Sequence, residues 1–208
     1  MGGPVLLAGE PLDRASTALV LVHGRGGTAE GILSLAGELT QPGFAFLAPQ
    51  AAGNSWYPLS FMAPILHNEP YLSGALDVLA ALLDRLAEGG IPAERTILLG
   101  FSQGACLALE FAARHAQRYG GLAGLSGGLI GPEGTPRDSP GSLAETPIFL
   151  GCSDVDPHIP RERVVESGQV LQRLGGEVTV QLYRGMSHTV NQDELDRVRS
   201  MMATLDLT

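Results

Sequence analysis

A serine between two glycines is the feature that most constrains the fold of this chain. Residues 100–104 read G-F-S-Q-G; they follow the apolar run T-I-L-L at residues 96–99 and precede an apolar helical pattern. A strand, a sharp turn and a helix in this order hold a serine at a strained backbone position, with its hydroxyl exposed as a nucleophile. Glycines two residues to either side keep β-carbons away from the flanking strand and helix. We therefore predict Ser102 as a nucleophile, the alternative being a Gly-rich turn without chemistry in a chain with 28 glycines.

Strand-like and helical patterns alternate along the chain. Helical spacing of leucine and alanine predicts a helix over residues 69–88, a second from Ser102 to about Tyr119, and a third that starts near Pro160. This alternation is typical of a mostly parallel sheet with helices on both faces. A chain of 208 residues that is 44% hydrophobic can bury one core but is too short for a large cap domain, so we expect a single α/β domain over residues 1–208. Short apolar runs predict its strands at residues 18–22, 44–48, 96–100, 121–126, 147–151 and 177–183.

An activated serine needs a histidine base. Downstream of Ser102 the candidates are His115, His158 and His188. His115 lies in the helix that Ser102 opens, from which its side chain cannot fold back. His188 follows residues 178–182, which alternate like a strand, and loops at the carboxyl ends of strands are where α/β sheets place their chemistry. We predict His188 as the base.

Two aspartates compete to orient this histidine. Asp154 and Asp156 both follow the apolar run at residues 148–150, so spacing alone does not separate them. Asp156 precedes Pro157, and this fixed turn would aim one carboxylate. Either aspartate could instead be a solvated turn residue that caps the following helix. We predict Asp156 as the acid.

The sequence H-G-R-G-G at residues 23–27 directly follows a predicted strand. It resembles the oxyanion-hole loop of esterases, in which one backbone N–H acts together with the N–H of the residue after the nucleophile. Here these donors would be Arg25 and Gln103, and His23 would brace the loop. The alternative is a phosphate-binding turn, but G-x-G-x-x-G is absent and the chain has no lysine. The lack of lysine also excludes Schiff-base and pyridoxal phosphate chemistry.

Four motifs, at residues 23–27, 100–105, 154–157 and 185–188, together resemble the phospholipase/carboxylesterase family of α/β-hydrolases, which includes acyl-protein thioesterases. The resemblance extends from about Ala18 to the end of the chain. It implies an α/β-hydrolase fold and a serine carboxylesterase for small to medium acyl esters, with thioesters and lysophospholipids as further substrates. It also implies that no metal or organic cofactor takes part.

The resemblance further implies roles for individual residues. The second aspartate of D-x-D-P is catalytic in the family, which supports Asp156. A tryptophan-bearing loop lies near the acyl site, and Trp56 occupies the corresponding place; Met186, beside the base, is a second expected substrate contact. Typical members have a hydrophobic residue after H-G, whereas this chain has Arg25. Its guanidinium would favour substrates with an anionic group near the scissile bond, the alternative being an ion pair with an acid such as Glu69.

Two other functions are compatible with these motifs. A dienelactone-type hydrolase of aromatic ring-cleavage products is the nearest enzyme alternative, although its usual nucleophile is cysteine. A non-catalytic binding protein on a hydrolase scaffold is the other, although every position of the Ser-His-Asp set is occupied.

Composition limits the partners of the protein. A net charge of −9 argues against nucleic-acid binding. No apolar run is long enough to span a membrane, and the N-terminus lacks the basic region of a secretory signal. Cys106 and Cys152 form no C-x-x-C pair and are expected as buried thiols in a reducing cytoplasm. We therefore expect a cytoplasmic enzyme that binds a small-molecule ester, with a homodimer as one possible assembly.

Overall fold

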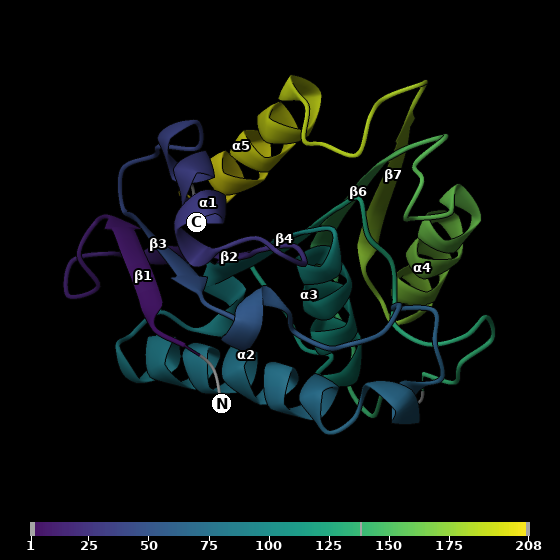
Figure 1. The fold of residues 1–208 in the computed structure, drawn as a ribbon. Coiled ribbons are helices and arrows are strands. Elements are labelled where there is room, and N and C mark those ends of the chain that lie inside the picture. The colour runs from purple at the N-terminus through teal and green to yellow at the C-terminus, as the bar shows by residue number, and fades with distance from the viewer. Residues whose placement is uncertain (1–2, 138, 207–208) are drawn as a thin grey trace.

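A seven-stranded sheet runs through the centre of the molecule (Figure 1). The structure is a computed structural model, and it describes residues 3–137 and 139–206. The strand order is β1-β3-β2-β4-β5-β6-β7; β1 pairs antiparallel with β3, and all other neighbouring strands are parallel. The strands are β1 (Val5–Gly9), β2 (Thr17–Val22), β3 (Phe44–Pro49), β4 (Thr96–Phe101), β5 (Gly121–Leu125), β6 (Pro147–Ser153) and β7 (Glu177–Tyr183).

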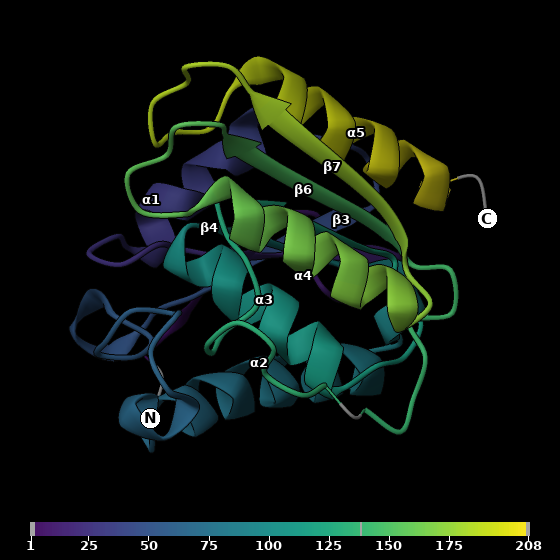
Figure 2. The ribbon, with the colours of Figure 1, turned by 90° about the vertical axis from the view of Figure 1, so that its right-hand side faces the viewer.

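Helices cover both faces of this sheet. In Figure 2, helices α2, α3 and α4 lie on one side of the strands, and α1 and α5 lie on the other. Each group buries its own apolar cluster against the sheet. The helices are α1 (Ala29–Leu33), α2 (Tyr71–Glu88), α3 (Gln103–Arg114), α4 (Arg161–Arg173) and α5 (Gln192–Asp206), with short 3₁₀ turns at Ser34–Gly37, Ala52–Asn54, Ile65–Asn68 and Ala93–Arg95. The predicted α/β architecture is confirmed, and the described residues contain no large cap domain.

Two elements differ from the sequence prediction. β1 was not predicted, although residues 5–8 read V-L-L-A; it is a short, only partly buried edge strand that joins the sheet by antiparallel pairing with β3. Helix α3 ends at Arg114 rather than near Tyr119. The chain leaves the helix there so that the Tyr119 ring enters the core, where the Tyr119 hydroxyl donates to the carbonyl of His115 at 2.7 Å.

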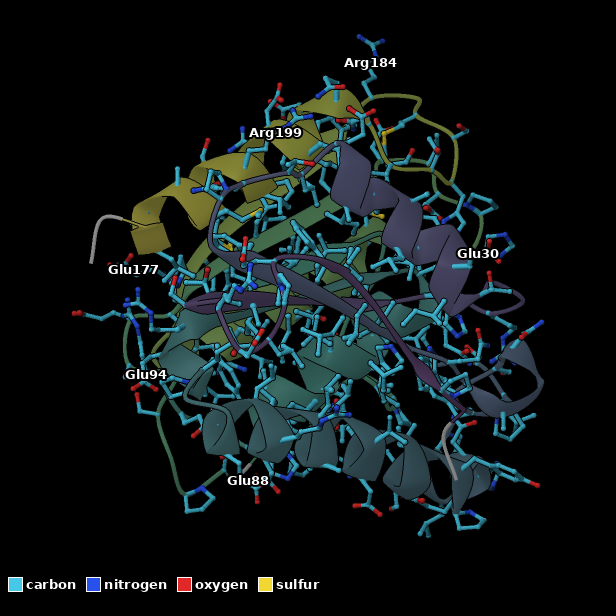
Figure 3. The ribbon with its side chains drawn as sticks, turned by 90° about the vertical axis from the view of Figure 1, so that its left-hand side faces the viewer. Glu30, Glu88, Glu94, Glu177, Arg184 and Arg199 are labelled. Atoms are coloured by element: carbon cyan, nitrogen blue, oxygen red, sulfur yellow. The ribbon has the colours of Figure 1, made fainter. Side chains whose placement is uncertain are left out.

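Many charged side chains lie on the outside of the molecule, although Glu110, Arg163 and Glu194 are buried. The six labelled in Figure 3 sit at its margin and point away from the sheet. None of the described helices combines the length and the apolar character that a bilayer-spanning segment requires. Cys106 and Cys152 are both buried free thiols, as expected from the sequence.

Candidate active site

Ser102 sits at the sharp turn between β4 and α3. Its backbone has φ 54° and ψ −118°, a strained combination for a residue with a side chain. The two glycines of the motif are required by space: a β-carbon on Gly100 would lie 2.2 Å from the carbonyl oxygen of Gly104, and one on Gly104 would lie 2.0 Å from that of Val22. The predicted strand, turn and helix are confirmed, and the turn presents the Ser102 hydroxyl at the carboxyl end of the sheet.

The structure brings Ser102, His188 and Asp156 into one series of hydrogen bonds. The Ser102 Oγ lies 2.9 Å from His188 Nε2, and His188 Nδ1 lies 2.7 Å from Asp156 Oδ2. An ionised carboxylate can only accept, so Nδ1 carries the proton and Nε2 presents its lone pair to the serine. The three residues follow strands β4, β6 and β7, which end at the same edge of the parallel sheet.

Asp156 is held in its ionised form by donors on both of its oxygens. Burial of the carboxyl group opposes ionisation, but hydrogen bonds from His188 and from the backbone N–H groups of His158 and Ile159 outweigh it, so the pKa of Asp156 is lowered. Asp154 plays a different part. Its Oδ1 accepts the N–H of Gly185 at 2.8 Å and thereby ties the aspartate loop to the histidine loop. Of the two candidate aspartates, the structure therefore places Asp156 against His188.

Two rings fix the orientation of His188. Phe101 lies with its ring centroid 4.9 Å from that of His188, and His158 meets His188 edge-on, also at 4.9 Å. His188 keeps 19% of its side chain exposed, whereas the Asp156 side chain is fully buried. The imidazole is thus packed against both rings and keeps only a small part of its surface exposed.

Two backbone N–H groups beside Ser102 have no acceptor within the described residues. They belong to Arg25 and Gln103, the two donors expected from the sequence. The loop of residues 23–27 packs directly on the turn, since a β-carbon on Gly24 would lie 3.3 Å from the Ser102 β-carbon. Unpaired N–H groups in this position are available to a substrate oxygen.

The side chain of Gln103 holds the loop that follows β3. Its Oε1 accepts the backbone N–H of Trp56 at 3.0 Å, and its Nε2 donates to the carbonyl of Tyr57 at 2.7 Å. The indole N–H of Trp56 donates to the carbonyl of His23 at 2.8 Å. Trp56 therefore links the loop before Arg25 to the residue after the nucleophile, and its side chain is buried behind the site rather than exposed in it.

His23 braces the same region. Its Nε2 accepts the N–H of Ala51 at 3.1 Å, so the proton sits on Nδ1, which donates to the carbonyl of Gly24 at 2.8 Å. Burial lowers the pKa of His23, which keeps the ring neutral and this pattern intact. The expectation that His23 supports the loop agrees with these contacts.

Arg25 makes no ion pair with any described residue, contrary to the alternative of a Glu69 partner. Its guanidinium donates to the carbonyls of Pro58 and Leu59, at 2.9 and 2.7 Å, and to the Ser55 hydroxyl at 3.1 Å. The carbonyl partners leave its positive charge unneutralised. Arg25 is exposed and lines the same pocket as Ser102.

The Ser102 pocket has a volume of about 380 Å³. Several residues that line this pocket were not predicted from the sequence, because they lie in loops whose course is set by contacts with distant residues. Burial raises the pKa of the Cys106 thiol in this wall to about 12, so the thiol stays neutral. Met186 does not line the pocket; its sulfur lies 2.9 Å from the Asn191 side-chain amide. The lining consists of Arg25, Tyr57, Ser60, Phe61, Ser102, Gln103, Cys106, His158, Ile159 and His188.

A buried carboxyl group supports the histidine loop from behind. Glu194 and Asn191 cap the start of α5 reciprocally: Glu194 Oε2 accepts the N–H of Asn191 at 2.9 Å, and Asn191 Oδ1 accepts the N–H of Glu194 at 3.0 Å. The other oxygen of Glu194 is buried without a hydrogen-bond partner among the described residues. Burial, with a smaller contribution from Asp193, raises the pKa of Glu194 from 4.5 to about 7.

This raised pKa makes stability depend on pH. Between pH 4.5 and about 7 the native state keeps a proton on Glu194 that the unfolded chain releases. The stabilisation of the native state by protonated Glu194 is therefore fully present below pH 4.5 and is lost as the pH rises through about 7. The free energy of unfolding changes by about 3 kcal/mol over this range. Glu194→Gln should remove this part of the pH dependence. Urea unfolding of both proteins at several pH values measures the difference, and an identical pH dependence would contradict the assignment.

Comparisons with known proteins identify the family of this chain. A model of the phospholipase/carboxylesterase family matches residues 8–206. Acyl-protein thioesterase 1 of Saccharomyces cerevisiae is 29% identical over 214 aligned residues, which cover 92% of this chain and 93% of that protein. Acyl-protein thioesterase 1 of Gibberella zeae is 32% identical over 126 residues; that match covers 58% of this chain and spans about half, 52%, of the relative.

Solved structures give the same result. The crystal structure of a phospholipase/carboxylesterase from Dyadobacter fermentans superimposes with a TM-score of 0.92 at 42% sequence identity, covering 96% of this chain and 95% of that one. The crystal structure of esterase PE8 superimposes with a TM-score of 0.78 at 27% identity and covers 98% of both chains. The family match over residues 8–206 includes the Ser102 turn and the loops of Asp156 and His188. This chain belongs to the phospholipase/carboxylesterase family of α/β-hydrolases.

Proposed function

We propose that this chain is a serine carboxylesterase that hydrolyses small to medium acyl esters through an acyl-enzyme on Ser102. The observation that carries the proposal is the unbroken series of hydrogen bonds from Asp156 through His188 to Ser102, at 2.7 and 2.9 Å. Its reactive end opens into a pocket. Membership of a carboxylesterase family supports the same reaction class.

The order of the reaction steps follows from the proton on His188 Nδ1 and the free lone pair on His188 Nε2. The lone pair of His188 Nε2 accepts the Ser102 proton while Ser102 Oγ attacks the ester carbonyl carbon. Asp156 stabilises the imidazolium that forms. His188 then donates this proton to the departing alcohol oxygen, the carbon–oxygen bond breaks, and an acyl-enzyme remains. A water molecule, deprotonated by His188, releases the acid by the same steps in reverse order.

The negative charge that develops on the carbonyl oxygen needs donors that are already in place. The unpaired N–H groups of Arg25 and Gln103 are suited to this role, and removing one such donor typically costs about 10²- to 10³-fold in kcat. Helix α3 starts at Gln103 and adds its positive N-terminal dipole. The side chains of Gln103 and Arg25 both form hydrogen bonds with the loop of residues 55–59, so the two backbone donors need little reorganisation during the reaction.

The acyl group would lie against Tyr57, Phe61 and Ile159, the large apolar residues of the Ser102 pocket. A volume of about 380 Å³ suits small to medium groups. Relatives named acyl-protein thioesterase support thioesters as part of the proposed substrate class, and the family description, which names a phospholipase, supports lysophospholipids. Rates on esters of rising acyl length, each with its matched thioester, would define the preference.

Covalent labelling tests the proposal directly. A fluorophosphonate should attach to Ser102 in the wild-type protein, where peptide mass spectrometry would locate it, and should not attach to Ser102→Ala. A folded wild-type protein that stays unlabelled would instead favour a non-catalytic binding protein on the same scaffold.

Arg25 is expected to select for anionic substrates. In Arg25→Leu, kcat/KM for an ester with a carboxylate near the scissile bond should fall about fivefold to tenfold more than kcat/KM for its neutral analogue, because an exposed charge pair is worth about 1 kcal/mol. The comparison needs the ratio of the two substrates, since the variant also loses the bonds to Pro58 and Leu59. Equal losses on both substrates would mean that Arg25 only braces the loop.

A matched control removes the same charge elsewhere. Arg85 is exposed in the last turn of α2 and does not line the Ser102 pocket. Arg85→Leu should leave the ratio between the two substrates unchanged. An equal shift in both variants would trace the effect to net charge rather than to the position of Arg25.

A further inference from the structure

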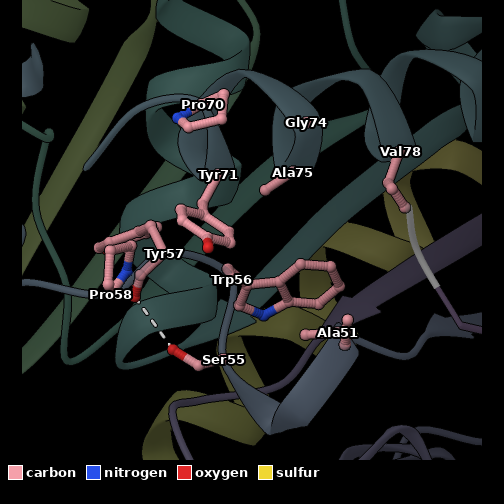
Figure 4. Close-up of a pocket in the computed structure, with 11 residues that line it drawn as sticks. Ala51, Ser55, Trp56, Tyr57, Pro58, Pro70, Tyr71, Gly74, Ala75 and Val78 are labelled. Atoms are coloured by element: carbon pink, nitrogen blue, oxygen red, sulfur yellow. Dashed lines mark hydrogen bonds between the residues drawn. The ribbon is translucent and has the colours of Figure 1, made fainter.

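A second pocket lies between the first half of α2 and the loop that follows β3 (Figure 4). Its volume is about 520 Å³, larger than that of the Ser102 pocket. No charged side chain lines it among the described residues, and its walls are mainly aromatic rings, prolines and small aliphatic groups. The lining consists of Ala51, Ala52, Ser55, Trp56, Tyr57, Pro58, Pro70, Tyr71, Gly74, Ala75 and Val78.

This α2 pocket is separate from the Ser102 pocket. Tyr57 is the one residue that lines both, and its side chain is buried between them. Trp56 lines only the α2 pocket, and its backbone and indole N–H groups are bonded to Gln103 and His23. The wall between the two spaces is therefore fixed by hydrogen bonds, so a molecule in one pocket does not occupy the other.

Gly74 is the feature that points to a ligand. It lies inside the 18-residue helix α2, where glycine is less favourable than alanine. A β-carbon built on Gly74 would meet nothing within 4 Å, and its φ is not in the left-handed region. Neither packing nor backbone conformation requires glycine here, but a larger side chain would project into the α2 pocket. The glycine keeps this space open.

We propose that the α2 pocket binds a neutral aromatic small molecule. The faces of Trp56 and Tyr71 and the adjacent prolines favour a flat aromatic group. The hydroxyl of Tyr71, a largely exposed residue, has no hydrogen-bond partner within the described residues and is available to one polar group of the ligand. Without a cation in the wall, and with a net charge of −9 on the protein, anionic ligands are disfavoured.

The chain supplies its own reporter, because Trp56 is its sole tryptophan. N-phenylnaphthylamine, a neutral fluorophore, should quench Trp56 by energy transfer in a saturable manner. Its sulfonated analogue, anilinonaphthalene sulfonate, has the same ring system with one negative charge and should bind at least about tenfold more weakly. Equal affinity for the two probes would overturn the choice of a neutral ligand.

Variants on the two sides of the shared wall locate the probe. Gly74→Leu fills the α2 pocket and should raise the Kd of N-phenylnaphthylamine by at least about tenfold, with a smaller rise in Gly74→Ala. Val78→Phe fills the pocket from its other end and gives a second test if Gly74→Leu does not fold. Ser60→Leu, which narrows the Ser102 pocket, should leave Kd unchanged.

The opposite pattern would overturn the proposal. A Kd raised by Ser60→Leu and unaffected by Gly74→Leu and Val78→Phe would place the probe in the Ser102 pocket. Quenching that does not saturate would mean nonspecific partition onto the surface. These measurements do not use esterase activity, so their outcome is independent of whether Ser102 proves to be a nucleophile.

Discussion

We expect Ser102→Ala and His188→Ala each to lower kcat on a short-chain nitrophenyl ester by about 10⁴- to 10⁶-fold. Without the serine oxygen no acyl-enzyme forms, and without the imidazole the Ser102 proton has no acceptor. His188 Nε2 is the sole described acceptor of the Ser102 hydroxyl, at 2.9 Å. Steady-state rates, corrected for the spontaneous hydrolysis of the ester, measure both losses.

The double variant provides the sharper test. Ser102→Ala/His188→Ala should be only slightly slower than either single variant, because the two side chains act as one unit. Losses that multiply would show that the residues act independently and would contradict a triad. Ser187→Ala is a suitable control, since Ser187 is an exposed serine next to His188 and its substitution should change kcat by less than about twofold.

Six of the seven strands were predicted from the sequence, and β7, which is exposed or half-buried along its length, is one of them. All residues of β2, β3 and β5 are buried, so each strand reads as an apolar run with clear ends. The edge strand β1 also carries a short apolar run, V-L-L-A, but it is only partly buried, and its place in the sheet is set by antiparallel pairing with β3. Buried apolar runs and the alternation of β7 thus predicted most strands, whereas the addition of β1 at the edge depends on its pairing with β3.

The positions of Ser102 and His188 at the sheet edge could be predicted for the same reason, since each follows a recognisable strand. The choice between Asp154 and Asp156 could not be made from spacing. It depends on where the loop after β6 turns, and the N–H groups of His158 and Ile159 fix that turn by binding Asp156. The turn at Pro157 favoured Asp156 in the sequence, and the resemblance to a family supported the same choice.

Several residues that line the two pockets could not be predicted from the sequence. The loop of residues 57–61 is held by buried Asn68, which accepts the N–H of Leu59 at 2.8 Å and donates to the carbonyl of Ser60 at 3.0 Å. No periodic pattern marks such a contact. Trp56 was expected to face the substrate, but its hydrogen bonds place it behind the donors and in the wall of the α2 pocket.

The second large effect is expected for Asp156→Asn, which should lower kcat by about 10⁴-fold with little change in fold. The N–H groups of His158 and Ile159 both donate to Asp156 Oδ1, so the amide oxygen of asparagine would take that position. Its NH₂ group would then face His188 Nδ1, where the carboxylate oxygen now lies at 2.7 Å. An NH₂ group can only donate, so Nδ1 would lose its proton and Nε2 would gain one.

An imidazole in that tautomer presents an N–H to Ser102 and cannot act as a base. Asp154→Asn is the matched control: its amide oxygen can still accept the N–H of Gly185, so kcat should stay within about tenfold of wild type. The kcat of both variants, with thermal unfolding to confirm the fold, separates the two aspartates. If Asp154→Asn is the inactive variant and Asp156→Asn is active, the acid is Asp154, and the hydrogen bond between Asp156 and His188 does not set the tautomer during the reaction.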